Sequence, residues 1–327
     1  MIITRAPYRI SFFGGGSDYE AWFKDHGGRV LTSTINKYCY LSARYMPPFL
    51  GSRYRIMWSK MENVDARADI QHAGVRGCLE YLGIDAGFEV NHAGDLPARS
   101  GLGSSSAFTV AMLNALHALN GEHRTPRELA REAVEVEQRV LRETVGIQDQ
   151  IECAHGGLNV IEIDKSGAWR VNPVVLPDGR IAELRTHLML FFTGLQRHAS
   201  EIAAAQIENV GVKAPQLNRM MMMVEEGVRV LTGDGELDFF GELLHEGWML
   251  KRGMSELVTT PEIDSAYERA RGAGAIGGKL LGAGGGGFML VFVKPHLREA
   301  VRLACSELIE VPFEFEADGS RVIFIDR

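Results

Sequence analysis

Apolar side chains recur with helical spacing directly behind a segment of glycine and serine. The segment reads Asp95-Leu-Pro-Ala-Arg-Ser-Gly-Leu-Gly-Ser-Ser-Ser-Ala107. The apolar positions that follow it are Phe108, Ala111, Met112, Ala115, Leu116 and Leu119. Their i, i+3, i+4, i+7, i+8 spacing predicts a helix with one buried face. The helix is therefore expected to begin where the Gly/Ser segment ends.

Strand and helix patterns follow one another irregularly along the rest of the chain. Strand-like patterns cover residues 2–13, 30–57, 88–91, 158–163, 187–192 and 288–293, with further strands near 313 and 322. Helical patterns cover residues 70–82, 125–142, 198–251 and 295–307. Proline and glycine between 172 and 185 mark a soft boundary, so we expect domains at 1–180 and 181–327. Periodicity alone predicts mixed α and β structure.

The Gly/Ser segment has the chemistry of an anion-binding loop. The first N–H groups of a helix lack internal acceptors, and the helix dipole places partial positive charge there. Glycines allow a phosphate to approach the backbone closely, and serine hydroxyls bind phosphate or a metal. A serine cap on a buried helix is the alternative, but one serine would suffice for it. The loop differs from a P-loop, because it does not end in Gly-Lys-Ser or Gly-Lys-Thr. A Gly-Lys pair occurs elsewhere in the chain, at Gly278-Lys279, but Leu280 follows it.

Composition narrows the classes of partner. The net charge is −7 and no dense basic segment occurs, which argues against nucleic acid or an anionic membrane as the main partner. The four cysteines form no C-x-x-C pair, so we expect reduced thiols rather than disulfides or a zinc site. Residues 1–5 show no signal-peptide pattern, and the apolar residues near 188–192 are too few to cross a bilayer. We therefore expect a cytoplasmic protein.

Three motifs in order resemble those of the GHMP kinases, the group of galactokinase, homoserine kinase, mevalonate kinase and phosphomevalonate kinase. Pro97-x-x-x-Gly-Leu-Gly-Ser-Ser-Ser-Ala107 resembles their ATP-binding motif. Ala6-Pro-Tyr-Arg9 with Asp18-Tyr19 resembles the first motif, and residues 277–288 resemble the third. The resemblance spans nearly the whole chain. It implies a two-domain α+β kinase whose active site lies between an N-terminal domain with the first two motifs and a C-terminal domain with the third.

The resemblance also implies how ATP and Mg²⁺ are bound. The triphosphate would contact Arg99, Gly101, Leu102, Gly103, Ser104, Ser105 and Ser106, and Mg²⁺ would contact Ser105 and Glu137. Without the resemblance, the sequence leaves two interpretations of Glu137 open. It shares a helical stripe with Ala130, Val134 and Leu141, behind a capping box that begins at Thr125. A carboxylate on a buried stripe needs a cation partner, whereas one at the edge of the stripe reaches water.

Two residues are expected to carry the chemistry of phosphoryl transfer. By the resemblance, Arg9 lies near the transferred phosphoryl group, where a permanent cation stabilises charge. Gly146-Ile-Gln-Asp-Gln150 resembles a galactokinase segment whose aspartate faces the accepting hydroxyl. This implies that Asp149 orients or deprotonates the acceptor. Without the resemblance, a helix cap or a turn would explain Asp149 equally well.

Two glycine-rich segments are expected to surround the acceptor. Gly14, Gly15, Gly16, Ser17 and Asp18 follow a strand, as in a tight loop or a purely structural turn. By the resemblance, Asp18 accepts hydrogen bonds from sugar hydroxyls, and the glycines replace a bulkier Gly-Glu-His-like segment of galactokinases, so galactose is not expected. Gly284, Gly285 and Gly286 would lie beside the reacting groups. Their formal G-x-G-x-x-G precedes a strand rather than a helix, which excludes a dinucleotide loop.

Within the GHMP kinases, the segments at residues 5–18, 95–106 and 145–150 resemble those of the D-glycero-D-manno-heptose phosphate kinases of bacterial nucleotide-heptose pathways. The resemblance implies phosphorylation of the anomeric hydroxyl of heptose 7-phosphate, which gives the 1,7-bisphosphate. A second cationic pocket would then bind the 7-phosphate. Arg197 and Lys279 are candidates, although either could be a surface charge.

Two other hypotheses remain open at this stage. One is an anomeric kinase for an unphosphorylated sugar of the fucose, hexosamine or galactose type. The other is a catalytically silent ligand-binding protein with the same fold, which the joint presence of Arg9, Ser105, Glu137 and Asp149 opposes. The expected partners are ATP and a small sugar phosphate, and the sequence is silent on the oligomeric state.

Overall fold

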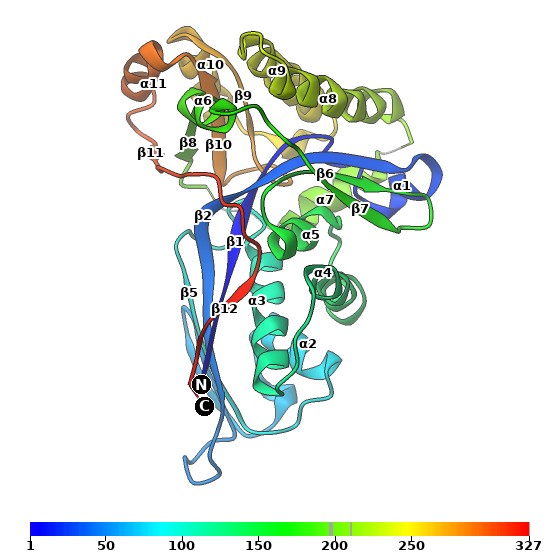
Figure 1. Cartoon of the computed structure of the whole chain (residues 1–327), viewed down its shortest axis with the longest axis vertical. Helices are drawn as coiled ribbons and strands as arrows, with labels where there is room; N and C mark the ends of the chain where they lie inside the picture. The colour runs from blue at the N-terminus through cyan, green and yellow to red at the C-terminus, as the bar shows by residue number, and fades with distance from the viewer. Residues whose placement is uncertain (196–198, 210, 327) are drawn as a thin grey trace.

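The computed structural model describes residues 1–195, 199–209 and 211–326, which form two β-sheets with helices packed against them (Figure 1). The larger sheet has the strand order β12-β1-β2-β5-β3-β4, with β6 branching from β2 and β7 pairing with β6. Its strands are β1 (Ile2–Phe13), β2 (Gly28–Tyr45), β3 (Tyr54–Met57), β4 (Met61–Val64), β5 (Phe88–Gly94), β6 (Leu158–Ile163), β7 (Trp169–Pro173) and β12 (Arg321–Ile325).

Strands β1 and β2 are the axis of the larger sheet. They pair antiparallel along almost the whole of β1, and β2 then divides its other edge between two partners. Residues 28–33 pair with β6, and residues 39–45 pair with β5. The length of β2 therefore joins two parts of one sheet.

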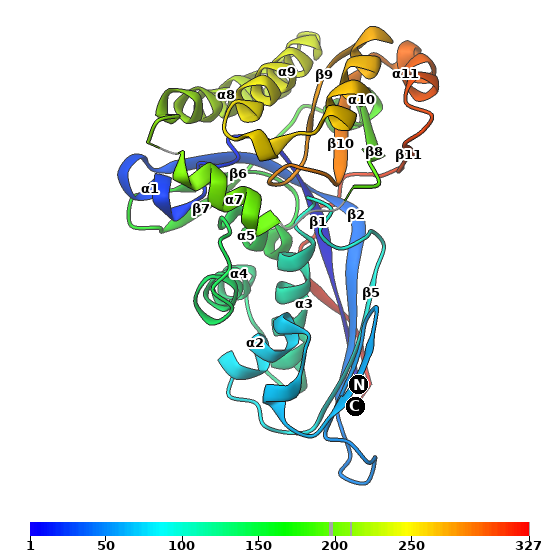
Figure 2. The ribbon, with the colours of Figure 1, turned by 180° about the vertical axis from the view of Figure 1, so that it is seen from behind.

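Helices cover one face of this sheet, as both views show (Figures 1 and 2). They are α2 (Ala73–Tyr81), α3 (Ser104–Leu119), α4 (Pro126–Glu135) and α5 (Gln148–His155), while α1 (Glu20–His26) follows β1 and η1 (Arg67–Asp69) is a 3₁₀ turn. The predicted helix behind the Gly/Ser segment is confirmed as α3. It packs on β1, where the hydroxyl of Thr4 donates to the carbonyl of Ala111 at 2.9 Å. The predicted capping box is also confirmed, because the Thr125 N–H donates to Glu128 at 2.8 Å.

The second sheet has the order β11-β8-β10-β9. Its strands are β8 (Leu188–Phe192), β9 (Ala275–Leu280), β10 (Phe288–Val293) and β11 (Ile309–Glu310). The surrounding helices are α6 (Arg180–His187), α7 (Ala199–Glu208), α8 (Ala214–Thr232), α9 (Asp238–Arg252), α10 (Pro261–Gly272) and α11 (Arg298–Ala304), with short turns η3 (Glu256–Val258) and η4 (Pro295–Leu297). The strand–turn–strand prediction for the third glycine-rich segment is confirmed by β9 and β10.

The end of the chain returns to the first sheet. Phe315 forms a bridge with Ile35, and β12 pairs antiparallel with β1. The N-terminal amino group donates to the carbonyl of Asp326 at 2.9 Å, so the two termini meet at the far end of the sheet (Figure 1). A division that follows the sheets therefore adds this last segment to the first domain. A single boundary at 180/181 remains a prediction that leaves this return out.

Two broad predictions can be compared with the described residues. All four cysteines are buried and free, as expected for reduced thiols. No helix within residues 1–195, 199–209 or 211–326 is long and apolar enough to cross a membrane.

Candidate active site

The Gly/Ser segment forms a loop that leads directly into the N-terminus of α3. Gly101 and Gly103 have φ values of 81° and 72°, in the left-handed region that favours glycine. Helix α3 begins at Ser104, and residues 104–106 line a cavity with their free N-terminal backbone. Leu102 does not line the cavity, since its side chain is fully buried in the apolar core, and its contact with ATP stays a prediction. The loop therefore presents main chain and hydroxyls, as an anion cradle requires.

The three glycine-rich motifs meet at this cavity through their backbones. The N–H of Arg9 donates to the carbonyl of Leu102 at 3.0 Å, and the N–H of Phe288 donates to Ser100 at 3.1 Å. A Cβ atom on Gly282 would lie 2.4 Å from the Cα of Gly101, so only glycine permits this approach. The cavity is lined from both sides by predicted and unpredicted residues, which are Arg9, Ser11, Gly15, Gly16, Asp18, Tyr19, Arg99, Gly101, Gly103, Ser104, Ser105, Ser106, Glu137, Thr144, Val145, Gly146, Gln148, Asp149, Gln150, Ala203, Gln206, Met220, Lys251, Lys279, Gly282 and Ala283.

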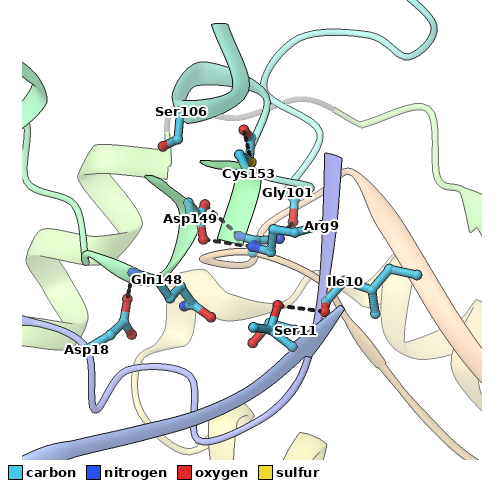
Figure 3. A network of polar contacts seen from close by, with 12 residues as sticks. Arg9, Ile10, Ser11, Asp18, Gly101, Ser106, Gln148, Asp149 and Cys153 are labelled. Carbon is cyan, nitrogen blue, oxygen red and sulfur yellow. Dashed lines mark hydrogen bonds and ion pairs between the residues drawn. The ribbon is translucent and has the colours of Figure 1, made fainter. Parts of the chain in front are cut away.

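Arg9 and Asp149 form a two-bond ion pair at the centre of the cavity (Figure 3). The Nε and Nη2 atoms of Arg9 each donate to one carboxylate oxygen of Asp149 at 2.7 Å, and Nη1 donates to the carbonyl of Gly101 at 2.7 Å. Arg9 is 3% exposed and Asp149 is 24% exposed. Burial alone would lower the pKa of Arg9, but the charge of Asp149 outweighs it and raises the pKa. One guanidinium thus joins β1, the Gly/Ser loop and α5.

Asp18 is held beside this pair by main-chain donors (Figure 3). Its carboxylate accepts hydrogen bonds from the N–H of Gly16 at 3.0 Å and of Gln148 at 3.3 Å. A Cβ on Gly146 would lie 1.8 Å from the carboxylate, so glycine makes room for it. Burial, with the nearby charge of Asp149, raises the pKa of Asp18. A buried carboxylate with acceptor capacity left suits a ligand that donates hydroxyl hydrogen bonds.

Glu137 is fully buried, so it does not reach water at the edge of its helix. Its Oε2 accepts hydrogen bonds from Ser106 Oγ at 3.0 Å and from Gln150 Nε2 at 2.5 Å. Its Oε1 has no hydrogen-bond partner among the described residues, since the hydroxyl of Thr109 donates to the carbonyl of Ser105 instead. Burial, reinforced by Glu143, raises the pKa of Glu137 to about 8. The contacting hydroxyl is that of Ser106, whereas Ser105 is exposed at the cavity.

A widened helical turn positions Glu137. The predicted helix to residue 142 is α-helical only to Glu135 and continues as the π-helical turn η2 (Val136–Val140). The N–H of Leu141 donates to the carbonyl of Val136 at 2.8 Å, five residues back. Such turns are rare and often occur at functional sites. The extra residue shifts the helical register, so Glu137 and Leu141 do not lie on one regular helical stripe as the sequence predicted.

The residues around Glu137 fit a magnesium ion. Its unpartnered Oε1 is a hard oxygen donor, and serine hydroxyls lie next to it at the start of α3. No group of three or more His, Cys, Asp or Glu residues suited to a metal occurs in the part of the chain that the structure describes. Mg²⁺ does not require one, because it is commonly bound by one or two carboxylates together with substrate phosphates and water.

Two lysines from the second half of the chain reach into the cavity. Lys279 is 6% exposed and donates to the main-chain carbonyls of Ser11 at 2.9 Å and Phe12 at 2.8 Å. It thereby joins β9 to β1 and is not a surface charge, while its contact with a substrate phosphate stays a prediction. Lys251, which the sequence did not single out, is 8% exposed and donates to the carbonyl of Gly282. Burial, with the charge of Arg9, lowers the pKa of Lys251 to about 8.

Several predicted substrate-binding residues do not line the cavity. A Cβ on Gly14 would lie 1.9 Å from the carbonyl oxygen of Arg29, and Ser17 accepts the N–H of Arg29 at 3.0 Å. Gly284, Gly285 and Gly286 pack in the same way against the main chain of η3 and residue 195. These glycines allow close packing of backbones, and their contact with the acceptor stays a prediction. Arg197 lies outside the described residues.

The cavity also holds polar side chains that sequence reasoning missed. Ser11, Gln148 and Gln150 each have a buried side-chain oxygen without a hydrogen-bond partner in the described structure, as Glu137 does. Since buried polar atoms are normally paired, four such atoms around one cavity indicate a polar ligand. Ser11, Gln148 and Gln150 each lie within two residues of Arg9 or Asp149 in the sequence, and this proximity could have identified them.

Comparison with known proteins agrees with this geometry. Residues 72–157 match the family model described as GHMP kinases N terminal domain, and residues 230–310 match GHMP kinases C terminal. The chain belongs to the GHMP kinase superfamily. It is therefore an ATP-binding kinase of the sugar kinase type that phosphorylates an alcohol group, and the predicted two-domain α+β fold is confirmed.

Three relatives illustrate the range of similarity. The D-glycero-alpha-D-manno-heptose 7-phosphate kinase of Campylobacter jejuni is 29% identical over 90% of both chains. A D-glycero-D-manno-heptose 1-phosphate kinase from Bacteroides thetaiotaomicron is 26% identical, with a TM-score of 0.78 over 100% of both chains. The galactokinase of Lactococcus lactis complexed with galactose is 20% identical, with a TM-score of 0.76 over 98% of this chain and 94% of that one, and shows the fold alone.

Proposed function

We propose that this GHMP kinase transfers the γ-phosphoryl group of ATP to the anomeric hydroxyl of D-glycero-D-manno-heptose 7-phosphate and forms the 1,7-bisphosphate. The observation that carries the proposal is a further cation in the cavity besides Arg9. Besides the start of α3, which suits the triphosphate, the cavity contains Lys251, which is buried and forms no ion pair with a described carboxylate. Buried charges are normally paired, so an acceptor that carries its own phosphate suits this site. The similarity to the Campylobacter enzyme supports the same substrate.

The reacting groups are assigned as follows under this proposal. The triphosphate binds at Gly101 and the first turn of α3, and Asp18 accepts hydrogen bonds from sugar hydroxyls. The anomeric oxygen attacks the γ-phosphorus, the bond to the ADP oxygen breaks, and the hydroxyl proton passes towards Asp149. Arg9 stabilises negative charge on the transferring group.

Asp149 acts more by orientation than as a strong base in this scheme. Both of its oxygens already accept hydrogen bonds from Arg9, which fix the position of the carboxylate. A loose transition state for phosphoryl transfer requires little early deprotonation of the acceptor. The pair therefore holds the hydroxyl in line with the γ-phosphoryl group and accepts its proton late.

Magnesium completes the proposed nucleotide site. Glu137 and Ser105 would hold the ion, which neutralises charge on the phosphates when it is bound. Glu137 becomes available for this role because its Oε1 is unpartnered, while Ser106 and Gln150 fix its other oxygen.

A coupled ADP-release assay with Mg-ATP tests the proposal. The sugar panel contains heptose 7-phosphate, unphosphorylated D-glycero-D-manno-heptose, mannose, fucose and galactose, and ³¹P NMR identifies the phosphorylated position. We expect turnover with heptose 7-phosphate to exceed that with every unphosphorylated sugar, with the new phosphate at the anomeric carbon. Equal or better turnover with fucose or another plain sugar would reject this substrate and retain the kinase.

A further inference from the structure

A recess extends the main cavity past the end of β1. It is lined by Gly15, Gly16, Tyr19, Gln206, Leu217, Met220, Lys251 and Met254. Among these described residues Lys251 is the one charged side chain, and no carboxylate accompanies it. The recess shares Gly15, Gly16 and Tyr19 with the wall that carries Asp18, so it lies on the acceptor side of the site.

Lys251 is fixed in place but keeps hydrogen-bonding capacity. It lies in the last turn of α9, and its ammonium donates to the carbonyl of Gly282. Gln206 of α7 donates to the next carbonyl, that of Ala283, at 2.6 Å. An ammonium has three N–H donors, so the one protein bond of Lys251 leaves two. Lys279 already gives two of its donors to the carbonyls of β1, which makes it the less available cation.

Gly15 lines both the main cavity and the recess. A Cβ on Gly15 would lie 3.6 Å from Ser11 Oγ and 3.9 Å from Gln148 Nε2, which are ordinary contact distances. A larger residue at this position is therefore compatible with the backbone, and it would project into the main cavity towards Ser11 and Gln148. Glycine leaves this volume for a ligand instead.

We propose that Lys251 binds the phosphate at the far end of the acceptor sugar, in the main cavity beside Gly15 and Gly16 at the mouth of the recess, and so sets the preference for a phosphorylated sugar. The assignment rests on the proposed function and names its second cationic pocket. The ligand group is a phosphomonoester dianion, which would use the two remaining ammonium donors and supply the missing counter-charge. Asp18 would hold hydroxyls nearer the anomeric end.

The decisive measurement is the ratio of kcat/KM for heptose 7-phosphate to kcat/KM for unphosphorylated heptose. In Lys251→Met we expect this ratio to fall about 10- to 100-fold, as for the loss of a charge-assisted hydrogen bond. Lys251→Arg should recover part of it. Lys24→Met, an exposed lysine on α1, is the matched control and should leave the ratio unchanged. Circular dichroism verifies that each variant is folded.

A second variant keeps the proposal testable if Lys251→Met does not fold. Gly15→Glu introduces a carboxylate at the recess without removing a protein contact. It should repel the sugar phosphate and lower the same ratio at least about tenfold. A Gly15→Gln control of similar size separates charge from bulk and should lower the ratio less.

The outcomes distinguish the two proposals. A wild-type ratio near one rejects the proposed substrate, and the Lys251 assignment with it. A high wild-type ratio that persists in Lys251→Met, or in Gly15→Glu, rejects the Lys251 assignment alone. Equal losses for both sugars would place Lys251 at the transferred phosphoryl group instead and would also overturn the assignment.

Discussion

The ion pair between Arg9 and Asp149 yields the sharpest prediction, because it links stability to catalysis. Asp149→Asn removes the charge that compensates a guanidinium that is only 3% exposed, and the new amide donors face the donors of Arg9. Breaking a buried pair costs about 3–5 kcal/mol. Asp149 is 24% exposed and water reaches its side, so we expect about 2–3 kcal/mol for this variant.

A double-mutant cycle separates the pair from its surroundings. Arg9→Met also loses the bond to Gly101, so it should be somewhat more destabilising than Asp149→Asn. In the double variant no unpaired charge remains, and the coupling free energy should be about 1–3 kcal/mol. Urea unfolding followed by fluorescence of the four tryptophans and by circular dichroism measures each corner. The exposed Glu20–Lys24 pair is the matched control, with an expected coupling of about 0.3–0.5 kcal/mol.

The same variants report on the catalytic assignment. Asp149→Asn should lower kcat at least about 10²-fold, while the dissociation constant of Mg-ATP stays within a few-fold of the wild type. Additive effects on unfolding, within about 0.5 kcal/mol, would show that the pair is not a unit in solution. A parallel loss of ATP affinity in Asp149→Asn would contradict its assignment to the acceptor hydroxyl.

Three further predictions concern charge and backbone. Metal-free Glu137→Gln should be more stable than the wild type by roughly 3–5 kcal/mol above pH 8. The carboxyl pKa of Glu137 is raised to about 8, so the stability that the wild type has below pH 4.5 is lost as the pH rises through 8, and urea midpoints across pH 5–9 measure this loss. Half-maximal activity of the variant should need at least about tenfold more Mg²⁺. Burial opposes charging of His117, but its two carboxylate partners raise its pKa, so the stability that the charged imidazole contributes is complete below pH 6.5 and is lost as the pH rises through the pKa of the folded state. The loss of unfolding free energy in His117→Gln, measured by urea unfolding, should therefore shrink over the same pH range. Gly101→Ala should be at least about 2 kcal/mol more destabilising than Gly179→Ala, because both have positive φ but only the first would bring a Cβ to 2.4 Å from a carbonyl oxygen, and equal losses in thermal unfolding would refute the close contact.

The Gly/Ser loop and its helix could be predicted because the signal is local. The period of apolar residues determines α3, and glycine with serine before a helix has few chemical explanations. Arg9 and Asp149 could also be assigned to one site, because each lies in a segment that resembles a GHMP kinase motif. Their direct contact with each other could not be read from the sequence, since it depends on how α5 packs against β1, and the two residues are 140 positions apart in the chain.

The glycines of the third motif show the opposite limit. Their number indicated a special backbone, and the structure bears this out at Gly284, whose missing side chain allows contact with Val258. Sequence cannot tell whether a glycine makes room for a ligand or for another strand of main chain. Gly15 and Gly284 differ in this respect only because β1 ends at an open recess, while the turn after β9 packs against η3.

Lys251 illustrates why a functional cation can escape a sequence search. It stands beside Arg252 at the end of an amphipathic helix, where charged residues usually face water. The helix is drawn inward by a glycine contact, since a Cβ on Gly277 of β9 would lie 1.9 Å from the carbonyl oxygen of Gly241 in α9. This close approach carries the last turn of α9 to the glycine-rich turn, where the ammonium meets Gly282. The position of the proposed phosphate-binding lysine thus depends on two glycines that do not line the cavity, one ten residues before it in α9 and the other in β9.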